Sequence, residues 1–175
     1  MFLVAPKPPV APLASFPQIV RDHQSMVFSI GWHFLRDRAA AEELAQDAFL
    51  QLHRNLDQIQ TPAHLVNWLR RVMTQRCIDY SRRARVRPQV GLDSAPEPRA
   101  VQSERDPWLT SQLDRQIARL PDRFRMMVVL RFQEELEPAE IAETLGIPVG
   151  TVKSSLHRAL ALLRGRMEKM QGTKT

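Results

Sequence analysis

Apolar residues recur every three or four positions in the first half of the chain, which is the period of amphipathic helices. One such stretch covers Phe16 to Phe34. A second begins after Asp37, the expected N-cap, and its apolar series continues to Leu56. A third runs from Thr61, a capping residue followed by proline, toward Arg83 and ends in a strongly basic run. The first half is therefore predicted to contain three helices.

The second half continues with the same period. A helix is predicted from about Trp108 until Pro121 interrupts it, and another covers Phe124 to Phe132. A last pair covers Pro138 to Leu145 and Pro148 to about Arg166. No stretch alternates apolar and polar residues as a strand does, and no internal repeat is visible. The predicted fold class is all-α.

Proline-rich segments divide the chain. Prolines at 6, 8, 9 and 12 break the apolar N-terminus, so we expect a disordered tail there and no leader or membrane helix. Prolines at 88, 96, 98 and 107 interrupt every period between the two helical blocks. We expect two small helical domains joined by a flexible linker, with a tail at 1–15, a first domain at 16–86, the linker at 87–107 and a second domain at 108–170.

The final helix pair has the pattern of a helix-turn-helix, so the second domain is expected to be a winged-helix-like DNA-binding domain. Ile141 and Ala142 lie on the inner face of the short helix, and Gly146 suits the left-handed position after it. The longer helix is expected to turn these residues inward: Val152, Leu156, Ala159, Leu160 and Leu163. Its outer face carries the candidate DNA-binding residues Thr151, Lys153, Ser154, His157 and Arg158.

Such a helix fits the major groove of B-DNA, where Lys and Arg donate to guanine and Ser or Thr reach phosphates. An ordinary helical hairpin with a solvated basic face is the competing interpretation. The short helix, the glycine turn and the polar stripe occur together, and this combination favours DNA binding.

Two surfaces of opposite charge are predicted in the first half. Arg71, Gln75 and Arg82 share one stripe of the third helix, and Arg83, Arg85 and Arg87 extend it into a cationic patch suited to phosphates. The second helix carries the acidic and polar residues Glu42, Glu43, Gln46 and Asp47. A protein interface, a metal site and a solvated face are all compatible with this acidic stretch. No histidine stands at ligand spacing, which disfavours the metal.

The composition supports a nucleic-acid partner. The net charge is +6 and the pI is about 10.4, which favours polyanions, although charge alone does not separate DNA from an acidic membrane surface. Cys77 is the only cysteine, so no intrachain disulfide can form, and we expect a reduced cytoplasm. No stretch reaches the roughly 18 apolar residues of a membrane span.

Three motifs, read in order, resemble those of bacterial RNA polymerase sigma factors of the sigma-70 family, in the extracytoplasmic-function (ECF) group, and the third motif consists of two segments. The segment AEELAQDAFLQL resembles the family's polymerase-binding helix, and VNWLRRVMTQRCIDYSRR resembles its promoter-melting helix. The segments LPDRFRMMVVLRF and EIAETLGIPVGTVKSSLHRAL resemble its carboxy-terminal promoter-reading domain. The resemblance covers about Phe16 to Met167.

The resemblance implies a role for each surface. The clamp helices of the largest subunit of core RNA polymerase would be bound by Glu43, Gln46 and Asp47. The minus-ten promoter element would be contacted by Arg71, Gln75 and the run from Arg82 to Arg87, and a flipped base would enter the loop from Asp57 to Pro62. The minus-thirty-five element would be read by Lys153, Ser154, His157 and Arg158. A cognate anti-sigma factor is a further implied partner. No cofactor, metal or catalytic residue is implied, so we expect no enzyme.

Some positions depart from the family pattern. Gln75 stands where Asn is common, Ser155 and Leu160 replace frequent arginines, and Glu137 with Pro138 replaces a Ser or Thr cap. These departures bear on the promoter sequence that is preferred.

Two other functions compete with this one. A stand-alone repressor or activator would need only the helix-turn-helix, and would have no use for an acidic helix followed by a basic one. A nucleic-acid-processing enzyme is disfavoured because the chain has no phosphate-binding glycine loop, no HExxH, no paired-cysteine pattern and no GxSxG.

Overall fold

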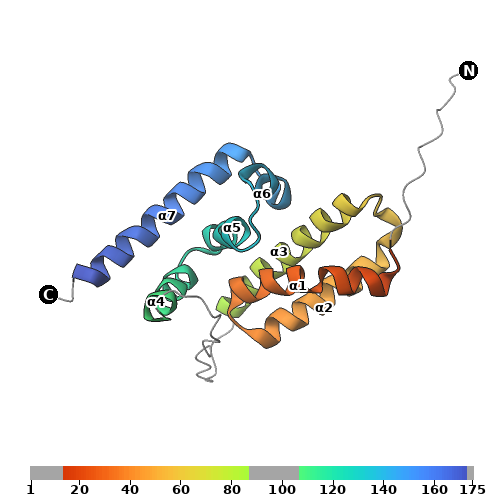
Figure 1. Ribbon diagram of the computed structural model, residues 1–175, viewed down its shortest axis with the longest axis horizontal. Coiled ribbons are helices and arrows are strands. Elements are labelled where there is room, and N and C mark those ends of the chain that lie inside the picture. The colour runs from red at the N-terminus through yellow and green to blue at the C-terminus, as the bar shows by residue number, and fades with distance from the viewer. Residues whose placement is uncertain (1–13, 87–106, 173–175) are drawn as a thin grey trace, which may run out of the picture.

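The computed structural model describes residues 14–86 and 107–172, which form seven α-helices and one short 3-10 helix (Figure 1). The first half contains α1 (Phe16–Leu35), α2 (Arg38–Arg54), the 3-10 helix η1 (Leu56–Gln58) and α3 (Pro62–Val86). The second half contains α4 (Pro107–Ala118), α5 (Asp122–Phe132), α6 (Pro138–Leu145) and α7 (Val149–Gly172). These residues contain no β-strand, and the all-α prediction is confirmed. Arg87 and nearly all of the predicted tail and linker lie outside the described residues.

Local capping interactions set several helix ends where the sequence predicts them. The Asp37 carboxylate accepts a hydrogen bond from the backbone N–H of Ala40 at 3.0 Å, which begins α2. The Thr61 hydroxyl accepts one from the N–H of His64 at 3.0 Å, which begins α3. Gly146 ends α6 in the left-handed region with φ of 64°, where a side chain would be strained.

Helices α1, α2 and α3 form a bundle whose centre is closely packed. Ile30, Phe34 and Leu69 are fully buried in it. Gly31 lies where α1 meets α2 and α3, because a Cβ there would stand 2.5 Å from the Met73 Cε atom and 3.3 Å from the Ala41 Cα atom. No larger residue fits at this crossing without a shift of its neighbours.

Helix α7 turns most of its predicted inner face toward α4, α5 and α6. Val152, Leu156, Ala159 and Leu163 are buried there as expected. The inward placement of Leu160 is wrong, since its side chain is 41% exposed. Ser155 is buried instead, at 7% exposure.

The two halves pack directly against each other and share one apolar core. Helix α5 contacts α1 and α3, and α6 contacts α3 (Figure 1). Met126, Met127 and Ile141 from the second half belong to the same buried cluster as the first-half side chains of the bundle. The sequence predicts two helical units in this order. It does not predict that they close on each other.

Candidate nucleic-acid interface

Helices α6 and α7 make a helix-turn-helix with an open outer face. The tight turn between them is closed by the Ile147 N–H, which donates to the Ala142 carbonyl at 3.0 Å. The predicted outer residues of α7 are here called the α7 surface: Thr151, Lys153, Ser154, His157 and Arg158. All of them are exposed except Thr151, which is half-buried. None of them forms an ion pair with another residue of the described chain.

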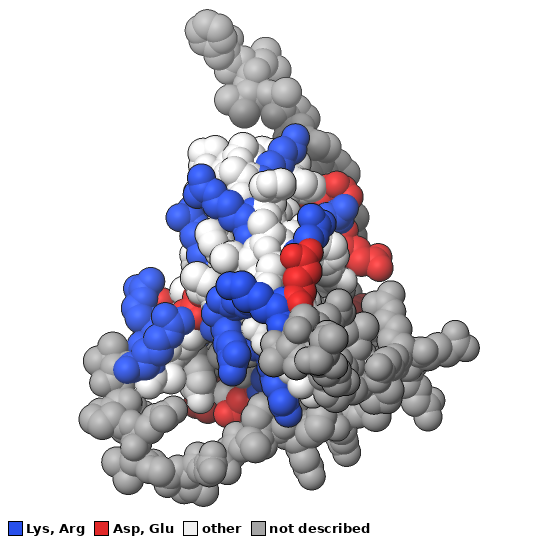
Figure 2. All heavy atoms as spheres, turned by 90° about the vertical axis from the view of Figure 1, so that its left-hand side faces the viewer, with Lys and Arg blue, Asp and Glu red and all other residues white. Residues whose placement is uncertain are grey.

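Cationic side chains gather on the side of the molecule that α7 covers. Figure 2 views this side and shows Lys and Arg on both sides of an uncharged strip, with Asp and Glu beside them mainly on the right. If α7 lay in the major groove of DNA, the phosphates on both sides of that groove would lie near these cations. The side of the molecule that carries α7 therefore has the charge that DNA requires.

A second cationic stripe lies on α3, in the first half. The α3 surface is defined by Arg71, Gln75, Arg82, Arg83 and Arg85. All five side chains are exposed, as predicted. In contrast to the α7 surface, this one comes close to the other half of the chain at two places. A Cβ at Gly146, in the turn before α7, would stand 3.7 Å from the Arg71 Nη2 atom. Arg85 forms an ion pair with Asp122, the first residue of α5.

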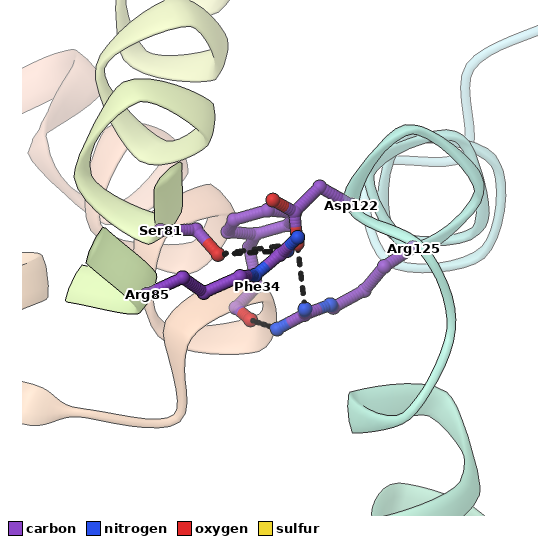
Figure 3. Close-up of polar contacts among 5 residues, drawn as sticks. All are labelled: Phe34, Ser81, Arg85, Asp122 and Arg125. Carbon is purple, nitrogen blue, oxygen red and sulfur yellow. Dashed lines mark hydrogen bonds and ion pairs between the residues drawn. The ribbon is translucent and has the colours of Figure 1, made fainter. Parts of the chain in front are cut away.

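Asp122 is the centre of a polar cluster that joins the halves (Figure 3). One carboxylate oxygen, Oδ1, accepts from Ser81 Oγ at 3.1 Å and from Arg125 Nη2 at 2.8 Å, and it also pairs with Arg85. Arg125 Nη1 donates to the backbone carbonyl of Phe34 at 3.1 Å, and its guanidinium lies 4.7 Å from the centre of the Phe34 ring. The Asp122 cluster therefore links α1, α3 and α5.

The two opposite charges at the centre of this cluster are largely buried. The side chains of Asp122 and Arg125 are each 13% exposed. Burial lowers the pKa of Arg125, and the carboxylate of Asp122 opposes that shift by favouring the charged guanidinium. The Asp122 carboxylate and the Arg125 guanidinium are both largely buried, so the charge of each is stabilised by the opposite charge of the other.

Three further polar contacts cross between the halves. Arg36, at the end of α1, forms an ion pair with Asp114 of α4. Asn67 Nδ2 of α3 donates to Glu143 Oε1 of α6 at 3.2 Å. Glu134, in the loop between α5 and α6, has its pKa raised by burial, and a hydrogen bond from Ser29 opposes this. The contact between halves therefore extends along α1 and α3.

The acidic face of α2 is also open. The predicted polymerase-binding residues are here called the α2 surface: Glu43, Gln46 and Asp47. Glu43 and Gln46 are exposed and Asp47 is half-buried. A groove of about 350 Å³ runs between α2 and α3, and Glu43 and Asp47 line it together with Gln75 and Arg83 of the α3 surface. The structure thus brings the α2 and α3 surfaces to the two walls of one groove.

Three residues with important contacts were missed by the sequence analysis: Arg76, Asp122 and Arg125. Arg76 lines the same groove as its neighbour Gln75, and its guanidinium reaches Asp47 of α2 at 3.0 Å. A signal for it exists in the sequence, because Arg76 adjoins the apolar positions Met73 and Cys77 and so requires a carboxylate partner. The i,i+3 spacing of Asp122 and Arg125 is a local signal for their own ion pair. Nothing local marks their other partners, Arg85 and Phe34, which are distant in sequence.

Two searches of the described chain concern other kinds of site. No three His, Cys, Asp or Glu side chains of residues 14–86 and 107–172 gather closely enough to hold a metal ion. In the same residues, every helix is too short or too polar to cross a membrane.

Comparison with known families assigns both halves. Residues 19–87 match the family described as Sigma-70 region 2, and residues 110–163 match Sigma-70, region 4. The chain is 29% identical to the ECF RNA polymerase sigma factor SigW of Bacillus subtilis, over 89% of this chain and 90% of the relative. It is 32% identical to the RNA polymerase sigma-E factor of Streptomyces antibioticus, over 87% of this chain and 84% of the relative.

Solved structures show the same fold. The sigma factor RpoE of Bartonella quintana, in complex with the anti-sigma factor NepR, matches with a TM-score of 0.73 and 18% identity, over 89% of this chain and 98% of RpoE. CnrH, in complex with the cytosolic domain of CnrY, matches with a TM-score of 0.64 and 21% identity, over 88% of each chain.

Proposed function

The chain belongs to the ECF group of the sigma-70 family and directs promoter-specific transcription initiation by RNA polymerase, and we propose that its three charged surfaces divide this work. The domain at 16–86 acts as region 2 and the domain at 108–170 as region 4, joined by a linker at 87–107. The open α7 surface is the observation that carries the proposal. It combines a helix-turn-helix, exposed donors and unpaired cations in one place.

The α7 surface reads the minus-thirty-five element in this proposal. Lys153 and Arg158 supply the cations for guanine edges, while Ser154 and Thr151 lie near the helix N-terminus, where phosphates approach. His157 stands on the same exposed face and adds a hydrogen-bond donor.

The α3 surface binds the minus-ten element. Its arginines neutralise phosphates, and Gln75 can hydrogen-bond a base edge. Extruding a base into the loop from Asp57 to Pro62 costs a few kcal/mol, which cationic backbone contacts would offset. This surface therefore melts the promoter, and α7 locates it.

The α2 surface docks on the clamp helices of the largest polymerase subunit. An exposed carboxylate at Glu43 and a half-exposed one at Asp47 suit a cationic partner helix. Inverting the exposed charge of Glu43 should weaken the attraction without unfolding the domain, because exposed substitutions seldom cost more than about 0.5 kcal/mol.

The closed arrangement cannot serve both promoter elements at once. Elements at minus ten and minus thirty-five are about 25 base pairs apart, which is about 85 Å along B-DNA. Arg71 of the α3 surface, however, adjoins the turn that precedes α7. We therefore propose that the described arrangement belongs to the chain before it engages a promoter, and that the halves separate in the complex.

We also propose a cytoplasmic location, no catalytic activity of the chain itself, and control by a cognate anti-sigma factor. The Bartonella quintana relative was solved with such a factor bound, and its fold covers 89% of this chain. Purified chain alone should turn over no DNA or RNA substrate.

In-vitro transcription with core polymerase on a randomised promoter library tests the whole proposal. Wild-type chain should direct initiation from a restricted set of sequences with two conserved elements. Asp47→Arg should lose core binding, whereas Lys153→Ala should keep core binding and change the preferred upstream element. Tight duplex binding by the chain alone, with no effect on polymerase output, would instead indicate a stand-alone regulator.

A further inference from the structure

One guanidinium ties two residues of α2 to α3. Arg76 Nη1 donates to Asp47 Oδ2 at 3.0 Å, and Arg76 Nη2 donates to Gln51 Oε1 at 2.9 Å. Asp47 and Gln51 are four residues apart, so they stand one above the other on the same face of α2. The planar fork of Arg76 therefore reaches both at once, as a lysine could not.

The contact is sheltered on one side and open on the other. The Arg76 side chain is 29% exposed, and its Nε atom is buried without a hydrogen-bond partner. The Asp47 side chain is 48% exposed, on the outer wall of the groove between α2 and α3. Arg76 thus approaches Asp47 from within the protein, while the carboxylate still faces the solvent.

We propose that Arg76 is a positioning residue for polymerase docking, which orients the Asp47 carboxylate toward the clamp helices. This inference rests on the proposed docking role of the α2 surface. Arg76 acts through Asp47 and Gln51 and does not itself touch the polymerase.

The hydrogen-bonding capacity of a carboxylate makes this role possible. An ionised carboxylate has about four acceptor sites on two oxygens, and Arg76 uses Oδ2 alone. The Asp47 side chain is also 48% exposed, so a partner can reach the carboxylate from the solvent side. A cation of the partner can therefore use the remaining acceptor sites while Arg76 holds the side chain in one rotamer, which reduces the entropy lost on association.

Two possible roles of Arg76 predict opposite effects of its removal on docking affinity. If Arg76 mainly neutralised Asp47, removing it would expose a stronger negative charge and tighten docking. If Arg76 positions Asp47, removing it should weaken docking. Affinity for core polymerase, measured without DNA by fluorescence titration of labelled full-length chain, separates these two outcomes.

Arg76→Met, which keeps the length of the side chain and removes the fork, should weaken core binding about 3- to 10-fold. Gln51→Leu, which leaves both charges intact and removes one arm of the contact, should weaken it less. Arg38→Met is the matched control, because Arg38 also pairs with a carboxylate of α2, at 2.8 Å from Glu42, and should leave docking unchanged.

A double-mutant cycle distinguishes positioning from a general loss of structure. Asp47→Asn should cost less in the Arg76→Met background than in the wild type, because its orientation is already lost. Tighter or unchanged binding by Arg76→Met, or additive effects in the cycle, would overturn the proposal. If Arg76→Met fails to fold, Gln51→Leu decides, and unchanged docking there overturns it. Unchanged docking by Asp47→Arg would refute the docking role itself, and this inference with it.

Discussion

The α3 and α7 surfaces, which we propose to bind DNA, are both cationic but differ in their contacts with the rest of the chain. The α7 surface makes no ion pair in the described residues, and nothing from the first half covers it. The α3 surface contributes Arg85 to the Asp122 cluster and Arg71 to the contact near Gly146. Cationic composition alone therefore does not tell whether a surface is available to DNA.

The difference arises from where carboxylates lie. Asp122 begins α5 and reaches the end of α3, where it pairs with Arg85 and accepts a hydrogen bond from Ser81. In our proposal, a phosphate of the promoter would take this place beside Arg85. Within residues 14–86 and 107–172, no Asp or Glu forms an ion pair with the α7 surface. A duplex that contains an upstream element should accordingly bind the closed chain, whereas the melted minus-ten strand should require opening.

The largest effect is expected at Asp122. Asp122→Ala removes the shared partner of Arg85 and Arg125, and the Arg125 guanidinium, whose side chain is 13% exposed, keeps only its contacts with Phe34 and loses its carboxylate. We expect a loss of about 3 kcal/mol in the free energy of unfolding, or a shift to an open chain, measured by urea denaturation and small-angle scattering.

Asp79→Ala is the control for that variant, because Asp79 is exposed on α3 and forms no ion pair in the described chain. It should change neither stability nor dimensions. If the two variants behave alike, the Asp122 cluster does not hold the halves together.

Substitutions on the α7 surface and on the α3 surface should change the affinity for an upstream-element duplex by different amounts, when binding is measured without polymerase. Lys153→Ala should cost about 1 to 3 kcal/mol if the lysine reads a base. Arg85→Ala should leave this affinity nearly unchanged, because Arg85 faces α5 and not α7. Equal losses for the two variants would mean that both surfaces bind the duplex nonspecifically.

The left-handed turn at Gly146, which lies near Arg71, can be probed without changing a charge. Gly146→Ala places a side chain at φ of 64° and should lower the free energy of unfolding by about 1 kcal/mol. Backbone strain causes most of this loss, because the new Cβ would lie 3.7 Å from Arg71 Nη2, which is an ordinary van der Waals distance. Gly150→Ala is matched, because it meets nothing within 4 Å and has no positive φ. It should be neutral or slightly stabilising by the same denaturation assay.

The smallest effect concerns pH. Burial, with Arg36 nearby, lowers the pKa of His33 below its ordinary value of 6.5, and Asp114 opposes the shift. The unfolded chain then binds the proton more readily, so stability is present above about pH 6.5 and is lost as the pH falls below it. Comparing unfolding midpoints at pH 7.5 and 5.5, His33→Asn should reduce the pH-dependent difference, by less than about 0.5 kcal/mol. An unchanged difference would contradict this assignment.

Local patterns predicted the helices and most exposed site residues, but not the contact between halves. The α6 boundaries, the cap at Asp37 and the left-handed Gly146 follow from nearby residues, which is why they were predictable. The prediction that Leu160 is buried failed because this residue lies about 80° around the helix from Val152, at the edge of the buried stripe. Pairs such as Arg85 with Asp122 depend on the tertiary fold, and no short-range period reports them.

The separation of α1 and α7 tests most directly whether the halves are closed in the free chain and open on a promoter. Cysteines introduced at the exposed positions Gln24 and Arg164 can carry a pair of labels, because Cys77 is buried and burial raises its pKa to about 12, which leaves it unreactive. Between the free chain and the promoter complex with core polymerase, the label distance should increase by several tens of ångströms, as elements about 85 Å apart require. The same distance in both states would contradict the account.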